Sequence, residues 1–421
     1  MKNSVLSQLG QRTAAPPISW LMEMALGRPK LISLAAGFTD NPSLPLAEAR
    51  ELLAEVLASR ATGEAALQYG PTLGDPELRQ LTAAHLQQQD SARGRDIFPV
   101  KNMLITNGSQ QLLYMITEAL CDPGDIVLVE DPTYFVYLSI AQSHGLRCRG
   151  VRLLEDGLDL TQLEQTLDEL KRDGALRRVK MLYLVSYFQN PSGVTTSLAK
   201  KAAALALLRR YERAAGHPIY LVEDAAYREL RFTGEDVPSA RAIAGAESRV
   251  IYTGTYSKPF ATGVRVGFGW LPEPVLTTVA RIKGNHDFGT ASLLQRLLAR
   301  VLRTNAYARH LTVLQTRYAR KARAMTEAIA EHFPATVRWE QPRGGLYVWA
   351  QLPASQKTGA KSKLFQTALA QGVLYVPGEL CYAADPTRRK PNHEMRLSFG
   401  NASEANIREG IARLGKVLRD L

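Results

Sequence analysis

Cysteine is scarce in this 421-residue sequence, which contains only Cys121, Cys148 and Cys381. An odd number of widely spaced cysteines does not suit a disulfide framework and is typical of thiols in a reducing compartment. The sequence also lacks an apolar run near the roughly 20 residues that a membrane helix needs. Its N-terminal stretch 1–8 has no unbroken apolar segment of signal-peptide length. We therefore expect a cytoplasmic protein with no membrane partner.

Clustered positive charge is absent as well, although the chain has 52 Lys and Arg against 40 Asp and Glu. The most basic stretch, 296–323, alternates its charges with apolar residues, as amphipathic helices with solvated outer faces do. We find no zinc-finger or RNA-recognition signature, and we predict no nucleic-acid partner and no metal site. The glycine-rich motifs of nucleotide-binding proteins are also missing, which argues against that class.

Short apolar runs do occur, and they alternate with helical segments between residues 100 and 290. Several are apolar throughout, as expected for strands that are buried on both faces. A typical intervening helix covers 109–120 and ends in the turn 122–125. The alternation predicts an α/β fold with a mostly parallel central sheet flanked by helices. The predicted strands are 103–106, 126–129, 181–185, 219–222, 250–253 and 266–270.

After about residue 330 the pattern changes to that of a smaller α+β unit. Its last predicted element is a helix capped by Ser403 with one apolar stripe. The predicted strands here are 346–350, 373–376 and 395–399, and the predicted surface loops are 355–363 and 384–393. We predict an N-terminal segment (1–45) that joins the small domain, a large α/β domain (46–325) and a small C-terminal α+β domain (326–421).

One segment, 255–267, combines hydroxyls, a lysine and an arginine directly after a buried strand. A lysine that reacts covalently with a carbonyl must be partly desolvated and near other cations, so that its amine is free at neutral pH. Arg265 and the hydroxyls near Lys258 suit a phosphate ester, because a guanidinium binds phosphate with two hydrogen bonds. A Ser-Lys pair alone is more typical of a surface turn, so this interpretation depends on other positions.

Three further turns place polar groups where predicted strands end. Asn107 to Gln111 opens a helix, whose free N–H groups bind anions. Asn190 precedes a Pro-Ser-Gly turn, and Asp224 ends a strand at the edge where parallel sheets gather ligands. Each of these three turns could also be explained without a function, as a strand-end cap or a turn former. Four such turns at successive strand ends nevertheless favour one shared site.

In this combination the sequence resembles the class I and II aminotransferases of fold type I, which depend on pyridoxal 5′-phosphate (PLP). The likeness runs from about Ile32 to the C-terminus and is greatest to the branch of 2-aminoadipate, kynurenine and aromatic aminotransferases. It implies the fold type I PLP-dependent transferase fold, with PLP held in the large domain. The implied activity moves the amino group of an α-amino acid to a 2-oxo acid, with 2-oxoglutarate the expected acceptor, by a ping-pong mechanism in amino-acid metabolism.

The resemblance also implies a role for individual residues. Lys258 matches the lysine that binds PLP covalently, Asp224 the partner of the pyridine nitrogen, and Tyr134 the aromatic residue stacked on the ring. Asn190 and Tyr227 match the hydrogen-bond partners of the ring 3′-oxygen. The implied phosphate-binding residues are Gly108, Ser109, Gln110, Thr255, Ser257 and Arg265.

The implied substrate site contains Arg396, which would bind the α-carboxylate, together with Gly37 and Asn190. Tyr69 matches a tyrosine that reaches the phosphate of the neighbouring subunit, which implies a homodimer. The segment Leu34–Phe38 departs from the usual Ala-Gly-Gly start, so Phe38 is expected either beside the substrate side chain or in the core. Physical chemistry agrees with these roles, because PLP acts as an electron sink, a freed Lys258 can carry the Cα proton, and a guanidinium fork orients a carboxylate.

Two alternatives involve the same resemblance. PLP-dependent β-elimination and other non-transaminating reactions use the same scaffold, and the sequence does not separate them from transamination. A transcription regulator with an aminotransferase-like domain would need a DNA-binding module, for which the roughly 30 residues before Leu31 are too few.

Overall fold

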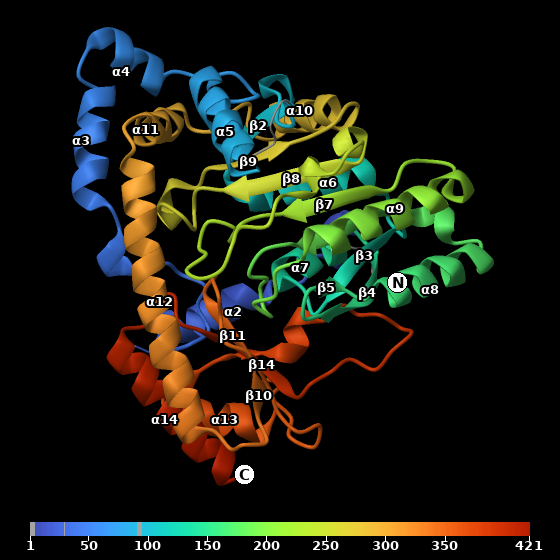
Figure 1. Cartoon of the computed structure of the whole chain (residues 1–421), viewed down its shortest axis with the longest axis vertical. Coiled ribbons are helices and arrows are strands. Elements are labelled where there is room, and N and C mark those ends of the chain that lie inside the picture. Colours follow the sequence, from blue (N-terminus) through green and yellow to red (C-terminus); the bar gives the residue numbers. More distant parts are fainter. Residues whose placement is uncertain (1–4, 29, 91–94) are drawn as a thin grey trace.

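The computed structural model describes residues 5–28, 30–90 and 95–421, so residues 1–4 of the N-terminal stretch lie outside the described residues. Its main feature is an eight-stranded sheet with the order β2-β9-β8-β7-β6-β3-β4-β5 (Figure 1). The strands are β2 (Met103–Thr106), β3 (Ile126–Asp131), β4 (Arg147–Leu154), β5 (Gly157–Leu158), β6 (Val179–Val185), β7 (Tyr220–Asp224), β8 (Val250–Thr255) and β9 (Gly267–Trp270).

The pairing in this sheet is mixed but mostly parallel. Strands β4, β3, β6, β7 and β8 pair in parallel, whereas β9 is antiparallel to both β8 and β2. Because β9 is antiparallel to both of its neighbours, β2 runs in the same direction as β8. The carboxyl ends of β2, β3, β6, β7 and β8 therefore lie along one edge of the sheet. The predicted mostly parallel sheet is confirmed.

Helices cover both faces of the sheet, which explains why its strands are apolar throughout. Val127 and Val129 of β3 belong to one buried cluster, and Ile126 and Leu128 belong to another. Successive side chains of a strand point to opposite faces, so both faces need apolar residues. Figure 1 shows α8 and α9 together on one side of the sheet. The helices that pack on the sheet include α6 (Gly108–Leu120), α7 (Phe135–Ser143), α8 (Leu160–Arg172) and α9 (Leu198–Ala215), and α10 (Val275–His286) packs on α6.

A second, antiparallel sheet has the order β10-β11-β14-β13 and lies at the other end of the molecule in Figure 1. Its strands are β10 (Arg338–Trp339), β11 (Tyr347–Gln351), β13 (Val376–Pro377) and β14 (Glu394–Ser398), with α13 (Lys363–Ala370) and α14 (Glu404–Arg419) beside it. The Ser403 side chain caps α14 as predicted, by accepting a hydrogen bond from the Asn406 amide. Near the N-terminus, β1 (Ile32–Ser33) pairs in parallel with β12 (Val373–Leu374).

The predicted single strand 373–376 is wrong, because it is divided between β12 and β13, which belong to different sheets. The predicted loops 355–363 and 384–393 contain no strand, but they are not wholly at the surface. Thr358 is fully buried and Asp385 nearly so, because Thr358 Oγ1 donates to the Glu394 carbonyl and Asp385 accepts from the Gly150 amide. The polar composition of the two loops gave no indication of the hydrogen bonds that Thr358 and Asp385 make inside the protein.

The remaining helices include α12, the long helix that runs beside both sheets in Figure 1. It contains residue 325, where the sequence places a domain boundary; the domain limits remain a prediction. Among the described residues, no helix combines the length and apolar character that crossing a membrane requires. These remaining helices are α1 (Gln8–Arg12), α2 (Pro17–Leu26), α3 (Leu46–Val56), α4 (Arg60–Leu67), α5 (Pro76–Gln89), α11 (Ser292–Arg303) and α12 (Ala306–His332).

Candidate active site

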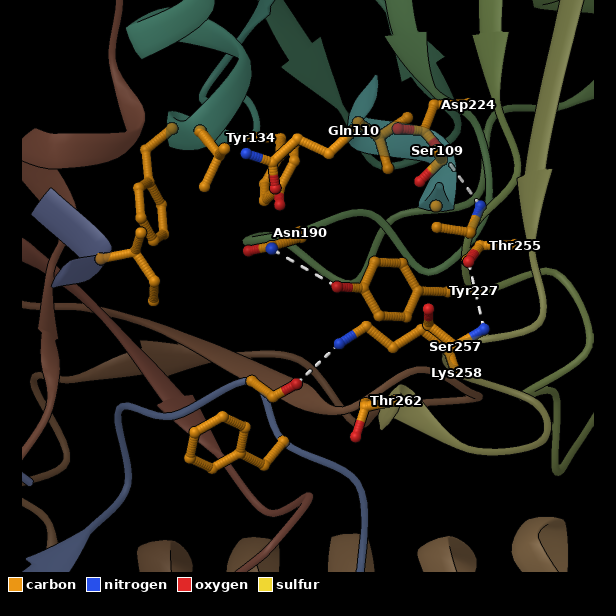
Figure 2. Close-up of a pocket in the computed structure, with 18 of the residues that line it drawn as sticks. Ser109, Gln110, Tyr134, Asn190, Asp224, Tyr227, Thr255, Ser257, Lys258 and Thr262 are labelled. Carbon is orange, nitrogen blue, oxygen red and sulfur yellow. Dashed lines mark hydrogen bonds between the residues drawn. The ribbon is translucent and has the colours of Figure 1, made fainter. Parts of the chain in front are cut away.

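A cavity of about 370 Å³ lies at the carboxyl edge of the large sheet, the edge at which parallel α/β sheets bind ligands. Figure 2 shows its polar side chains pointing into a common space. Nearly all the residues predicted for the site line it: Gly37, Gly108, Ser109, Gln110, Tyr134, Asn190, Asp224, Tyr227, Thr255, Ser257, Lys258, Arg265 and Arg396. The sequence-based set is thus brought together from segments far apart in the chain.

Tyr69 is the exception. It does not line this cavity, and its residue is 83% exposed, with its ring edge-on to Phe288 at 5.3 Å between centroids. That it serves the site of a neighbouring subunit stays a prediction.

Lys258 lies in the turn after β8, and its Nζ donates to the Gly37 carbonyl oxygen at 2.7 Å (Figure 2). Burial, together with the charges of Arg396 and Arg265, lowers the pKa of this lysine to about 8. A partly buried amine that is influenced by two guanidiniums is a nucleophile that is partly neutral near physiological pH.

Asp224 is the last residue of β7 and is 3% exposed. Its Oδ2 accepts a hydrogen bond from the Tyr183 hydroxyl at 2.8 Å, and its Oδ1 accepts from the Ala226 amide at 3.1 Å. Burial raises the pKa of Asp224 to about 6 despite these two donors. A cation beside this carboxylate would stabilise its charged form and lower that pKa.

An anion-binding cradle is formed where α6 begins. Gly108 has φ +74, and a Cβ there would meet Arg265 Nη2 at 2.7 Å. A Cβ at Gly267 would lie 2.4 Å from the backbone of Gly108 and Ser109, so close packing requires glycine at 267, whereas the left-handed φ favours it at 108. Arg265 donates to Ser257 Oγ at 3.3 Å. A guanidinium, hydroxyls and free N–H groups at a helix start are the groups that bind a phosphate monoester.

Arg396, on β14, is 1% exposed. Its Nη1 donates to Asn190 Oδ1 at 2.7 Å and its Nη2 to the Ala35 carbonyl at 2.6 Å. Its Nε is buried and has no hydrogen-bond partner among the described residues. A buried, unpaired guanidinium donor beside a cavity is well suited to an incoming carboxylate, because leaving it unpaired is costly.

Several lining residues were not predicted from the sequence, and most of them are apolar. Tyr347 belongs to a predicted strand, but the strand pattern gave it no site role. Phe38 lines the cavity and is only partly buried, which favours its substrate-side interpretation over the core one. No three His, Cys, Asp or Glu residues in the described part of the chain form a metal site. The lining residues that the sequence did not indicate are Ile18, Met22, Phe135, Val136, Val185, Ala226, Thr262 and Tyr347.

Comparison with known proteins agrees with this geometry. The family model for aminotransferase class I and II matches residues 29–414. Aromatic-amino-acid aminotransferase 1 of Thermococcus litoralis is 34% identical over 93% of this chain and 88% of its own. The 2-aminoadipate transaminase of Thermus thermophilus is also 34% identical, over 94% and 91%.

The fold is shared with solved structures of the same kind. The crystal structure of Pyrococcus horikoshii kynurenine aminotransferase superimposes with a TM-score of 0.88 at 31% identity and covers 99% of this chain and 97% of that one. The fold type I architecture and the family resemblance expected from the motifs are thereby confirmed. The chain belongs to the class I and II aminotransferases.

Proposed function

We propose that this aminotransferase moves the amino group of an α-amino acid to a 2-oxo acid, with 2-oxoglutarate as acceptor, by a ping-pong mechanism that uses PLP. The observation that carries the proposal is the content of one cavity: a partly buried lysine whose pKa is lowered to about 8, a phosphate-fitting cradle, the Asp224 carboxylate and the unpaired Arg396 Nε. Each group matches one part of PLP or of an amino-acid substrate.

The residues present fit PLP. The cradle of Gly108, Ser109, Gln110, Thr255, Ser257 and Arg265 would hold its phosphate. Asp224 would pair with the protonated pyridine nitrogen, and that cation would in turn lower the raised pKa of Asp224. Tyr134 would cover one ring face, and Asn190 and Tyr227 would donate to the 3′-oxygen. Two related structures support this fit: the P. horikoshii enzyme contains PMP, and the T. thermophilus α-aminoadipate aminotransferase contains N-(5′-phosphopyridoxyl)-L-leucine.

When bound, PLP withdraws electron density from the substrate Cα. The chain's own residues then act on the proton and on substrate orientation. The free amine of Lys258 would take the proton from the substrate Cα as a base and deliver it to C4′ of the cofactor as an acid. Arg396 would hold the α-carboxylate with its free Nε and fix the angle of the Cα–H bond. Gly37, whose carbonyl holds Lys258 Nζ at 2.7 Å, would leave room for the substrate beside it.

A single carboxylate site supports the ping-pong order. Donor and acceptor both carry an α-carboxylate, and among the described residues Arg396 is the one guanidinium that lines the cavity apart from Arg265, which belongs to the cradle. The two substrates would therefore occupy the same place in turn.

The assembly and location are also proposals. We propose a homodimer in which Tyr69 contributes to the neighbouring active site, since it is exposed in its own chain. We propose a cytoplasmic location and a role in amino-acid biosynthesis or metabolism; the free cysteines Cys121, Cys148 and Cys381 suit a reducing compartment.

The test is to trap and map the cofactor and then to identify the reaction. Borohydride reduction of the purified yellow protein is expected to leave a pyridoxyl group on Lys258, and a label on another lysine would contradict the site. A panel of amino acids with several 2-oxo acids should then yield paired keto-acid and amino-acid products. A β-eliminating enzyme would instead release ammonia without consuming the 2-oxo acid.

A further inference from the structure

Tyr347, at the start of β11, connects the small sheet to the residues beside Lys258. We propose that it is a positioning residue: its hydroxyl strengthens the hydrogen bond that Tyr227 donates to the cofactor's 3′-oxygen, and its ring supports Arg396. This inference rests on the proposed function, because it assumes that PLP occupies the cavity. No motif indicates this role from the sequence.

Four side chains form a closed ring of contacts. Arg396 Nη1 donates to Asn190 Oδ1 at 2.7 Å, and Asn190 Nδ2 donates to the Tyr227 hydroxyl at 3.5 Å. The hydroxyls of Tyr227 and Tyr347 lie 3.0 Å apart. The Tyr347 ring centroid lies 4.3 Å from Arg396 Cζ, which closes the ring. All four residues are at most 5% exposed, so water competes weakly for these contacts.

The ring joins the two sheets. Asn190 and Tyr227 follow β6 and β7 of the large sheet, whereas Tyr347 and Arg396 lie on β11 and β14 of the small one. In the antiparallel pairing, Arg396 is opposite Trp349, so Tyr347 is its diagonal neighbour on the same face. The carboxylate site and the 3′-oxygen site are therefore linked by direct contacts.

The number of hydroxyl protons decides which of the two tyrosines donates in the hydrogen bond between Tyr227 and Tyr347. A tyrosine hydroxyl has one proton, and Tyr227 must use its own to donate to the 3′-oxygen. The Tyr227 oxygen then accepts, and Tyr347 is the donor at 3.0 Å. A hydrogen bond accepted by a hydroxyl polarises it and makes it a better donor. Removing the Tyr347 hydroxyl should therefore weaken the bond from Tyr227 to the cofactor.

A weaker hydrogen bond from Tyr227 to the 3′-oxygen should shift the pH titration of the visible absorbance of bound PLP in one direction. Donation to the 3′-oxygen stabilises its negative charge most when the neighbouring nitrogen, which links the cofactor to Lys258, has lost its proton. A good donor therefore lowers the pKa of that nitrogen, and a weaker donor raises it. The visible band of bound PLP follows this titration, so it measures the Tyr347 contribution without any turnover.

Gly37 supplies an independent observation about the Tyr347 hydroxyl. A Cβ at Gly37 would lie 2.6 Å from Tyr347 Oη but 3.7 Å from Cζ, and Gly37 has no left-handed φ. The obstacle to alanine at this position is thus the hydroxyl and not the backbone or the ring. A Gly37→Ala substitution should displace the hydroxyl from Tyr227, and removing the hydroxyl should relieve the contact.

The experiment titrates the visible absorbance of the PLP holoenzyme in Tyr347→Phe, Gly37→Ala and the double variant. Tyr347→Phe should keep the cofactor and the Arg396 contact while raising the titration midpoint by a fraction of the roughly 0.4 to 1 pH unit that loss of one whole neutral hydrogen bond would cause. Its kcat should fall several-fold while KM for the donor stays within about twofold, because the ring remains under Arg396. Tyr347→Leu, which also removes the ring, should raise KM as well.

Gly37→Ala should shift the midpoint in the same direction as Tyr347→Phe. The double variant should match Tyr347→Phe rather than the sum of both changes, because only ordinary contact remains at 3.7 Å. Tyr375→Phe is the control: its buried hydroxyl donates to the Thr358 carbonyl and does not line the cavity, so its midpoint should equal that of wild type.

An unchanged midpoint in both Tyr347→Phe and Gly37→Ala, or strict additivity in the double variant, would overturn the role of Tyr347. If Tyr347→Phe does not fold, an unchanged midpoint in Gly37→Ala alone overturns it. A wild-type protein that binds no PLP would instead refute the proposed function, so the two failures are distinguishable.

Discussion

Lys258 Nζ lies 2.7 Å from the carbonyl oxygen of Gly37, although 221 residues separate the two in sequence. Gly37 comes shortly after β1, which pairs with β12 near the small sheet, so an N-terminal segment reaches across the cavity to hold the lysine of the large sheet. A carbonyl accepts a hydrogen bond from an amine or an ammonium group alike. It therefore fixes the position of Nζ, while the surrounding charges determine whether the amine is protonated.

The first prediction concerns the pH dependence of cofactor capture. The reacting form of Lys258 is the neutral amine, whose fraction increases as pH rises through the lysine's pKa. With that pKa lowered to about 8, the rate at which apoprotein captures PLP should increase with pH and level off above about 8, not near the ordinary lysine value of about 10.4. Stopped-flow absorbance measures it. Arg396→Gln should move the inflection upward, because it removes one of the two cations that lower the pKa; an inflection near 10 in wild type would contradict the assignment.

The second prediction concerns Asp224. Asp224→Ala removes the charge that would stabilise the protonated pyridine, a contribution required mainly in the transition state. We expect kcat to fall by about 100-fold or more with a much smaller change in KM, as for the loss of a charged hydrogen-bond partner in a buried site. Tyr183→Phe, which removes only the donor to Asp224 Oδ2, should cost less than about tenfold. Near-normal turnover in Asp224→Ala would make the carboxylate a simple strand-end cap.

The sequence predicted the side of the cavity proposed for the cofactor much better than the side proposed for the substrate. Strands such as β6 and β8 were evident because both faces of the sheet are covered, and the turns after them hold the predicted polar residues. Strand β4, Arg147–Leu154, was missed because exposed arginines interrupt its apolar pattern. Ile18 and Met22 on α2 line the cavity through tertiary contact alone, and no local pattern shows which distant helix will cover a site.

The third prediction concerns the subunit that Tyr69 serves. Mixed dimers should be prepared from a Lys258→Ala chain and a Tyr69→Ala chain. If Tyr69 acts across the dimer, one site of each mixed dimer has both Lys258 and an intact Tyr69 from the partner. Random mixing of equal amounts should then restore about a quarter of wild-type activity. If Tyr69 serves its own chain, no site contains both residues, and activity should stay near the level of the parents; a fully active monomer in ultracentrifugation would also contradict the proposal.

The fourth prediction concerns the substrate side chain. Ile18, Met22 and Phe38 give the cavity an apolar wall, and the cations among the described lining residues, Lys258, Arg265 and Arg396, already have other proposed roles. We expect donors with large apolar or aromatic side chains to react faster than aspartate. Phe38→Ala should lower kcat/KM for phenylalanine by about tenfold or more, because the apolar contact is lost.

The same Phe38→Ala variant should change kcat/KM for alanine by less than about twofold, since a methyl group does not reach the wall. Equal losses for alanine and phenylalanine would mean that Phe38 supports the Gly37 turn and does not contact the side chain.

The last prediction concerns Arg396, whose buried Nε has no hydrogen-bond partner among the described residues. Donor and acceptor would use this arginine in turn, so Arg396→Lys should lower kcat/KM for both half-reactions. The loss of a charge-assisted hydrogen bond costs about 1.5–3 kcal/mol, or roughly 10- to 150-fold, and lysine rescues poorly because a point charge cannot reproduce the planar fork. Cofactor content should remain close to wild type, because Arg396 is outside the phosphate cradle. Stopped-flow absorbance of each half-reaction gives the two rates separately. A loss confined to one half-reaction would place the other substrate elsewhere in the cavity, and equal rates in wild type and Arg396→Lys would mean that the carboxylate does not bind at Arg396.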